Sequence, residues 1–436
     1  MSQESLKTGS IDKFQLTANI GGNSVDLSAG ISDFRIYESV LSNTVTATAV
    51  VVETGSGVKG SIDALPIRGG EDLKFQIRDA RGNALNASMK VNRLRNASPE
   101  STRDLYILDF ASPEYFNNDT IRVTERYDGP ISESVRKILL KLRTTRVLDI
   151  EETANPYNFM GNDRKPFYTC TWLAQKSIPS AYSISNDLKG RAGFLFFQTF
   201  DSFKFKSIDT LLTQPAKAKY IFSAGDKGDN DDIIINYTID RDVDLHENLT
   251  LGYYGCTGLF FDPVSFSYVV RDFDITDGQS RESPKNTEFA GDLIDNETRG
   301  SAKSPYSSRN LPNQVSRMLN MVLDTGTLPA GKSSEKELDE WRNNPNQKFD
   351  TAGSTIQSIM RYNQLFTIQL TITIPGNFAI RAGDTVKCSF PQLDSSKNTG
   401  KNPKTKGIYM VAHVCHKITS ENTLTSLSLV RDHYKK

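Results

Sequence analysis

A short motif occurs twice in this 436-residue chain, once near each end. The first copy reads IRGGEDLKF from Ile67 to Phe75, and the second reads IRAGDTVKC from Ile380 to Cys388. Both copies carry isoleucine, arginine, glycine and an acid at the same spacing: Ile67, Arg68, Gly70 and Glu71 in the first, and Ile380, Arg381, Gly383 and Asp384 in the second. The duplication constrains the chain to two similar modules, and it favours a ring-building or scaffolding protein over an enzyme.

The segments around the two copies match as well. Apolar and polar residues alternate before each copy, at residues 45–52 and 365–374, which predicts a strand in both places. Two further strands are expected after each copy, at residues 89–94 and 105–110 and again at residues 409–414 and 424–430. The same order of strand, turn, strand and hairpin is therefore predicted at both ends of the chain.

The motif itself has the composition of a turn. Gly70 and Gly383 suit a position with positive φ, which glycine adopts without a steric penalty. Ile67 and Ile380 are expected to be buried on the strand face. The arginine of each copy either holds a carboxylate or lies at a subunit contact.

Composition limits the class of protein. The chain has 52 Lys and Arg against 52 Asp and Glu, so no overall positive charge would hold nucleic acid by counterion release. The N-terminus lacks the apolar core of a signal peptide, and no apolar run reaches the length of a membrane span. We therefore expect a protein that is made and folded in a cytoplasm, with no membrane insertion. The cysteines lack metal-ligand spacing and are expected to be reduced thiols at Cys170, Cys256, Cys388 and Cys415.

The chain divides into four segments. Residues 1–113 are strand-rich and form the first β-module, whereas residues 114–218 combine helical spacing with an aromatic hairpin and are expected to form a small α+β domain. Residues 219–273 and 355–436 together supply the second β-module, and the polar residues 274–354 interrupt it as a partly helical insertion. The expected fold class is mainly β with α+β parts.

Individual elements follow from local patterns. Helices are expected at residues 131–142, around Trp172 until Pro179, at residues 311–322, and from Ser334, where Glu337 completes a capping box. Strands of the second module are expected at residues 233–239, 249–254 and 258–270, the last bent at residues 262–263. An aromatic hairpin is expected at residues 194–205.

Residues 326–333 read GTLPAGKS and satisfy the phosphate-loop pattern, in which backbone N–H groups cradle phosphates and the lysine binds the terminal ones. Such a loop normally follows a buried parallel strand. Here the preceding residues have helical spacing and the neighbourhood is polar. We interpret the segment as a linker between helices, with a P-loop nucleotide-binding enzyme as the alternative.

Other chemical patterns are incomplete. His413 and Cys415 are expected to face one side of a strand and His416 the other, which argues against a metal site. The acidic run at residues 226–232 lacks the glycine and the final glutamate of a calcium loop, so we interpret it as a solvated turn. The Gly-x-Ser-x-Gly elbow of serine hydrolases does not occur. The sequence therefore predicts no catalytic residue, no cofactor and no metal.

In their order along the chain, several segments resemble the baseplate hub proteins of contractile-tailed, T-even-like bacteriophages, a family related to the hub part of type VI secretion spikes. The segments that carry the resemblance are residues 34–40, 193–208, 374–391, 407–416 and 427–432. Residues 274–354 match least.

The resemblance implies a homotrimer in which each subunit contributes two tail-tube-like antiparallel β-barrel modules. The resulting six-module ring would join the sixfold tail tube to the threefold central spike and let DNA pass through its lumen without specific binding. The implied partners are the central spike, the tube or tube-initiator proteins and the baseplate wedge proteins. The implied location is the virion tail baseplate, assembled in the bacterial host cytoplasm.

Two further alternatives remain open at the level of sequence. One is the hub of a contractile injection system that is not carried by a phage. The other is a surface carbohydrate-binding β-protein, based on the aromatic residues at 194–205 and 260–268, although their alternation assigns them to a protein core.

Overall fold

The computed structural model describes residues 9–19, 21–53, 67–99, 104–180, 192–222, 233–241, 244–252, 255–263, 266–274, 316–328, 331, 333, 335–336, 351–390 and 407–431. The N-terminal module contains β1 (Ser10–Thr17), β2 (Ser24–Asp26), the short 3-10 helix η1 (Ser28–Gly30), β3 (Ile31–Ser39), β4 (Thr46–Glu53), β5 (Asp72–Arg78), β6 (Ala84–Pro99) and β7 (Asp104–Ala111). The α+β domain contains α2 (Pro113–Thr120), β8 (Arg126–Tyr127), α3 (Ile131–Lys141), β9 (Val147–Ile150), β10 (Phe159–Met160), α4 (Pro166–Ala174), β11 (Phe194–Gln198), β12 (Ser202–Ser207) and α5 (Ile208–Leu212).

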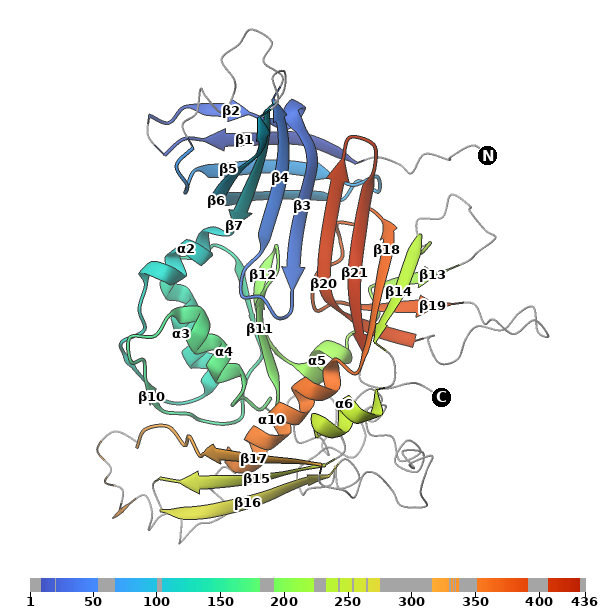
Figure 1. The fold of residues 1–436 in the computed structure, drawn as a ribbon. Helices are drawn as coiled ribbons and strands as arrows, with labels where there is room; N and C mark the ends of the chain where they lie inside the picture. The colour runs from blue at the N-terminus through green and yellow to red at the C-terminus, as the bar shows by residue number, and fades with distance from the viewer. Residues whose placement is uncertain are drawn as a thin grey trace, which may run out of the picture.

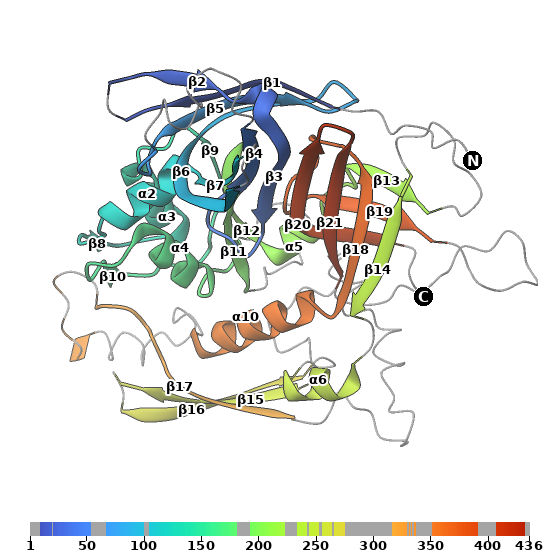
Figure 2. The ribbon, with the colours of Figure 1, turned by 45° about the horizontal axis from the view of Figure 1, so that its top comes forward.

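The C-terminal module contains β13 (Ala218–Ile221), β14 (Asn236–Arg241), β18 (Ile368–Pro375), β19 (Thr385–Ser389), β20 (Gly407–Thr419) and β21 (Thr423–Arg431). The segment between β14 and β18 contains α6 (Leu245–Thr250), β15 (Gly255–Asp262), β16 (Ser267–Asp274), β17 (Arg317–Val322) and α10 (Thr351–Leu365). Figures 1 and 2 show the two modules side by side, with the α+β domain beneath the first and the small sheet of β15, β16 and β17 beneath α10.

Both modules belong to one sheet of 13 strands. Its order is β14, β18, β21, β20, β3, β4, β7, β6, β5, β1 and β2, with β19 and β13 branching from β20. The order is open in the described part of the chain, where it ends at β14 and β2 and closes into no barrel. The fold is thus mainly β, as expected, whereas the β-barrel modules implied by the resemblance are not found in the described residues, because the strands form one open sheet.

The two repeats have the same strand topology. In the first, β3, β4, β7, β6, β5 and β1 are hydrogen-bonded in that order; in the second, β14, β18, β21, β20, β19 and β13 follow the same order. The last pair differs, because β1 is antiparallel to β5 whereas β13 is parallel to β19. The repeated sequence motif therefore marks a repeated strand arrangement.

Among the described residues, one strand pair joins the repeats. β20 of the C-terminal module is antiparallel to β3 of the N-terminal module, from His413 opposite Ser39 to Thr419 opposite Asp33. Figures 1 and 2 show these strands, in red and blue, side by side at the centre of the molecule. The backbone ladder therefore continues from one module into the other without an edge between them.

Alternation of side chains explains why these segments form strands with one buried face. In β18, Ile368, Leu370, Ile372 and Ile374 are buried while the residues between them are half-buried. β-Branched residues favour this conformation because they pack well on a pleated surface. The strands expected before and after each copy of the motif are confirmed.

The main elements expected between residues 114 and 218 are also found. α3 follows Gly129 and Pro130, and its buried residues Ile131, Val135 and Ile138 recur at helical spacing. α4 contains Trp172, and the aromatic hairpin appears as β11 paired with β12. The five phenylalanines of the hairpin strands are at most 4% exposed, which argues against using them to bind a carbohydrate.

Two expected elements of the insertion and its flank are wrong. Residues 249–250 end α6, a helix whose N-cap Asp244 accepts from Glu247 N at 2.9 Å, instead of starting a strand. Met318 and Val322 lie in the strand β17, which pairs parallel with β15, where a helix was expected. Apolar spacing cannot separate a short helix from a strand when a neighbouring strand supplies the hydrogen bonds. Leu311 and the proposed capping box at Ser334 and Glu337 lie outside the described residues.

The strands expected at residues 258–270 form the hairpin β15–β16 with its turn after Asp262, but they do not join the second module. With β17 they make a separate three-stranded sheet that packs on α10 through Cys256, Phe260, Ile356 and Met360. α10 itself was not predicted. Phe266 and Tyr268 are 82% and 70% exposed, so the expectation that the aromatics at 260–268 are core holds for Phe260 and fails for these two.

The four cysteines are free thiols, of which three are buried and Cys415 is half-buried. Burial raises the pKa of Cys170 and of Cys388, which keeps both thiols protonated. Of the helices in the described residues, none has the length and apolar character needed to cross a bilayer.

Candidate functional site: the junction between the two repeats

Both copies of the repeated motif form the same turn. In each copy the acid accepts a hydrogen bond from the backbone N–H of the motif arginine. Glu71 Oε1 lies 2.7 Å from Arg68 N, and Asp384 Oδ2 lies 2.8 Å from Arg381 N. The acid is conformationally useful in both places because it satisfies a backbone donor that the turn leaves unpaired.

The motif glycine and acid also bind each turn to a strand of its own repeat, β6 in the first and β20 in the second. Gly70 N donates to Val91 O at 2.7 Å, and Gly383 N donates to Val411 O at 2.8 Å. In return the N–H of each valine donates to the carbonyl of the motif acid, at 2.9 Å and 2.8 Å. Both glycines have positive φ, 87° and 83°, so the expected turn position is found in each copy.

The two motif arginines have different surroundings. Arg68 is exposed, whereas Arg381 is buried where three parts of the chain meet. Arg381 Nε donates to Asp201 Oδ2 at 2.7 Å in the β11–β12 turn, and Nη1 donates to the carbonyl of Phe378. Its guanidinium carbon lies 5.6 Å from the ring centre of Phe200. Of the two roles expected for a motif arginine, a carboxylate partner or a subunit contact, Arg381 has the carboxylate partner.

Glu38 on β3 is the third charged member of this group. It is 2% exposed, and its two oxygens accept from Phe200 N at 2.9 Å and from Ala382 N at 3.1 Å. Arg381 Nε lies 3.8 Å from Glu38 Oε1. Burial raises the pKa of Glu38, while the guanidinium and the two N–H donors act in the opposite direction. We call Glu38, Asp201 and Arg381 the junction cluster.

The junction cluster links the three parts of the chain. Glu38 belongs to the N-terminal module, Asp201 to the α+β domain and Arg381 to the C-terminal module. A second polar group acts nearby, where Gln198 Oε1 accepts from Val45 N at 3.0 Å and from Ser112 Oγ at 2.8 Å. These contacts fix the orientation of the parts, because buried polar groups require their partners in place.

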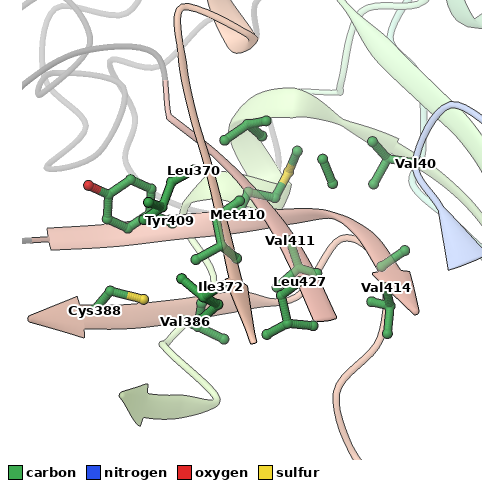
Figure 3. Close-up of a cluster of buried hydrophobic side chains, with 14 of the residues drawn as sticks. Val40, Leu370, Ile372, Val386, Cys388, Tyr409, Met410, Val411, Val414 and Leu427 are labelled. Carbon is green, nitrogen blue, oxygen red and sulfur yellow. The ribbon is translucent and has the colours of Figure 1, made fainter. Parts of the chain in front are cut away.

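Apolar side chains cross the junction in both directions. Phe378, from the turn after β18, packs in the core of the N-terminal module with Phe34 and Phe75. Val40, which directly follows β3, packs in the core of the C-terminal module, and Figure 3 draws it with other members of that core. Each module thus contributes a side chain to the core of the other, which makes the two repeats one mechanical unit.

The phosphate-loop match has a different setting from the one expected. The strand β17 precedes it, but this strand is largely exposed. Gly326 N donates to Asp324 Oδ1 at 3.2 Å and Thr327 N donates to Asn158 O at 2.8 Å, so two backbone donors are occupied within the chain. Lys332 lies outside the described residues.

The remaining candidate residues do not form a chemical centre. His413 is exposed and His416 is buried, which places them on opposite faces of β20 as expected. The acidic run at residues 226–232 lies outside the described residues. Within the part of the chain that the structure describes, no group of three or more His, Cys, Asp or Glu side chains is arranged to hold a metal ion.

Sequence reasoning missed Glu38 and Asp201. A usable signal for Glu38 was present, because it continues the alternation of Phe34 and Ile36 on the core-facing side of β3. A carboxylate in that position requires a buried partner. Asp201 carries no such signal, since an acid in a hairpin turn is ordinarily solvated.

His416 is expected to make the protein less stable as the pH falls below 6.5. Its ring is 1% exposed, Nδ1 lies 3.0 Å from Thr425 Oγ1, and burial, with Arg381 nearby, lowers its pKa to about 3. The unfolded chain binds this proton near pH 6.5 and the folded chain only near pH 3. Stability is therefore present above 6.5 and is lost on acidification at up to about 1.4 kcal/mol per pH unit.

Urea denaturation between pH 7 and pH 5 measures this effect. The His416→Gln variant should show a smaller loss of stability over this range than the unmodified protein, and replacing the exposed His246 with Gln should leave the loss unchanged. Equal pH dependence in the unmodified protein and His416→Gln would contradict the assignment.

Comparison with known proteins gives matches at the level of structure. No protein-family model and no curated sequence matches the chain. A tail protein from Neisseria meningitidis MC58 is 12% identical with a TM-score of 0.51, over 96% of this chain and 97% of that one. The 43 kDa tail protein of prophage MuSo2 from Shewanella oneidensis is 10% identical with a TM-score of 0.51, over 97% and 100%.

A third match, at 10% identity and a TM-score of 0.43, is an Escherichia coli component of the type VI secretion system, covering 98% of this chain and 77% of that one. The first two matches are described as tail proteins. Over almost its full length, this chain has the fold of these two tail proteins, one of which comes from a prophage.

Proposed function

We propose that the chain is the structural hub of a phage tail baseplate, a homotrimer whose six quasi-equivalent modules form a ring. The observation that carries the proposal is the repeated strand order, β3-β4-β7-β6-β5-β1 in one module and β14-β18-β21-β20-β19-β13 in the other. The full-length likeness to tail proteins supports the same function.

The duplication supplies a reason for the trimer. A sixfold tube and a threefold spike cannot share equivalent contacts through a ring of identical single modules. Three chains with two similar modules each present six similar surfaces on one face of the ring and three identical surfaces on the other. Within a chain, the β3–β20 ladder and the junction cluster hold the two modules in a fixed relative position, which keeps their surfaces evenly spaced around the ring.

The partners follow from the two faces of the ring. The sixfold face binds the tail tube or its initiator proteins, the threefold face binds the central spike, and the wedge proteins surround the ring in the baseplate of the virion. The equal numbers of acidic and basic residues suit a lumen through which DNA slides without being retained.

Electron microscopy of the purified protein, alone and co-expressed with a candidate spike protein, tests the proposal. Threefold rings with six lobes are expected, and the spike should add density to one face on the threefold axis. Particles without a ring in both preparations would contradict the hub function.

A further inference from the structure

We propose that neighbouring copies of this chain join edge to edge, with β14 of one copy pairing antiparallel to the C-terminal half of β6 in the next. The surface is a pair of strand edges and the partner is a second copy of the same chain. The number of copies rests on the proposed trimer, whereas the identity of the edges rests on the strand pairing within one chain.

Both edges have unpaired backbone in the described part of the chain. β14 pairs with β18 on one side, and no described strand lies on the other. β6 pairs with β7 from Lys90 to Pro99, whereas β5 pairs with β6 only from Ala84 to Lys90, the last opposite Asp72. Exposed strand edges of this kind are templates for pairing with another chain.

The chain contains the template for the missing pair. β14 is the equivalent of β3, and β6 is the equivalent of β20, because each holds the same place in its repeat. Inside the chain, β3 and β20 pair with each other across the module boundary. When their equivalents make the same contact between copies, β14 of one chain pairs with β6 of the next. Each copy therefore has two different pairing edges, one at β14 and one at β6.

The register follows first from β6. Val91 is equivalent to Val411, since each exchanges the same hydrogen bonds with its motif turn. In both repeats a bulge follows directly, between Val91 and Arg93 in β6 and between Val411 and His413 in β20. Counting on from the bulge makes position 96 of β6 the equivalent of His416.

The register of β14 follows from its pairing with β18. Ile239 lies opposite Leu370, as Ile36 lies opposite Ala47 in the first repeat. Leu370 pairs with the residue of β21 that pairs with Val411, and Ala47 pairs with the residue of β7 that pairs with Val91. Leu370 and Ala47 are therefore equivalent positions. His416 pairs with Ile36 inside the chain. Position 96 of one copy is therefore predicted to pair with Ile239 of the next.

The side chains described on the two edges suit this contact. Leu94 is 37% exposed on β6 and Ile239 is 45% exposed on β14, and both lose exposed apolar surface in the pair. Arg93 is exposed on β6, where Arg95 is paired with Asp109 of the same chain at 2.8 Å, and Asp240 is exposed on β14 at a bulge next to the predicted contact. Opposite charges on paired strands favour the proposed partner over other edges.

Disulfide cross-linking of the full chain tests the register. Residues opposite each other in an antiparallel pair have Cα atoms roughly 4.5–5.5 Å apart, within the range a disulfide spans. The double variant Asn96→Cys with Ile239→Cys should form covalent dimers and then closed trimers under mild oxidation, resolved on a non-reducing gel. The matched control, Arg93→Cys with Ile239→Cys, displaces one cysteine by about 10 Å along the strand and should not cross-link. Each single variant measures the background from native cysteines.

The outcomes separate the interface from the hub function. Trimers in solution that fail to cross-link, or that cross-link equally well in the control, overturn the proposed edges and leave the hub function standing. A ladder of species larger than a trimer overturns closure by three copies while retaining the edges. If the double variant stays monomeric while the unmodified protein is trimeric, it is first reduced and allowed to reassemble. Failure of that reassembled trimer to cross-link on oxidation also overturns the register.

Discussion

Arg381→Ala is expected to lower the free energy of unfolding by roughly 3–5 kcal/mol, as typically follows from removing one partner of a buried ion pair. The buried partner is Glu38, whose Oε1 lies 3.8 Å from Arg381 Nε; Asp201, which accepts from the same nitrogen at 2.7 Å, is 65% exposed and contributes less. Without the guanidinium, Glu38 stays buried without its cation between two modules. Urea denaturation followed by circular dichroism measures the change.

The sequence repeat supplies the matched control. Arg68 occupies the same motif position in the first copy but is exposed, so Arg68→Ala should change stability by no more than about 0.5 kcal/mol. Both substitutions keep the backbone N–H that the motif acid accepts from. Similar losses in the two variants would mean that the arginine acts through the turn, and the junction cluster would lose its assigned role.

Phe378→Ala is the second substitution with a large expected effect, a loss of about 3–5 kcal/mol. The ring is 1% exposed, lies in the core of the N-terminal module, and stands 5.0 Å from the His416 ring. Its backbone N–H also donates to Asp79 Oδ2 at 2.8 Å, a bond that the substitution retains. The loss therefore reports the side chain that crosses between modules, again by urea denaturation.

Phe266→Ala is the control for this loss, since Phe266 is 82% exposed and its removal should cost about 0.5 kcal/mol or less. Phe378→Leu should recover more than half of the stability lost in Phe378→Ala, because it refills most of the cavity. A loss below about 1 kcal/mol for Phe378→Ala would show that the two cores are independent.

The parts of the fold that could be predicted are those in which local pattern and tertiary structure agree. Alternation in residues 365–374 and helical spacing in residues 131–142 both led to the observed elements, because each has one face in a core. The repeated motif indicated equivalent turns before any contact was known. Their hydrogen bonds to Val91 and Val411 show why the glycine and the acid were both retained.

The parts that could not be predicted depend on long-range partners. Met318 and Val322 fit a helix by spacing, and only the parallel ladder with β15 makes them a strand. The pairing of β3 with β20 brings together segments almost four hundred residues apart, and no local signal encodes it. The junction cluster is of the same kind, because Asp201 becomes significant only once the fold places it beside Arg381.

The mass of the purified protein in solution tests the central claim, that the repeats are quasi-equivalent units of a closed ring, most directly. A chain of 48.6 kDa should assemble, by mass photometry and by light scattering at high concentration, into a discrete species of three chains. A monodisperse monomer that persists at high concentration would contradict the account.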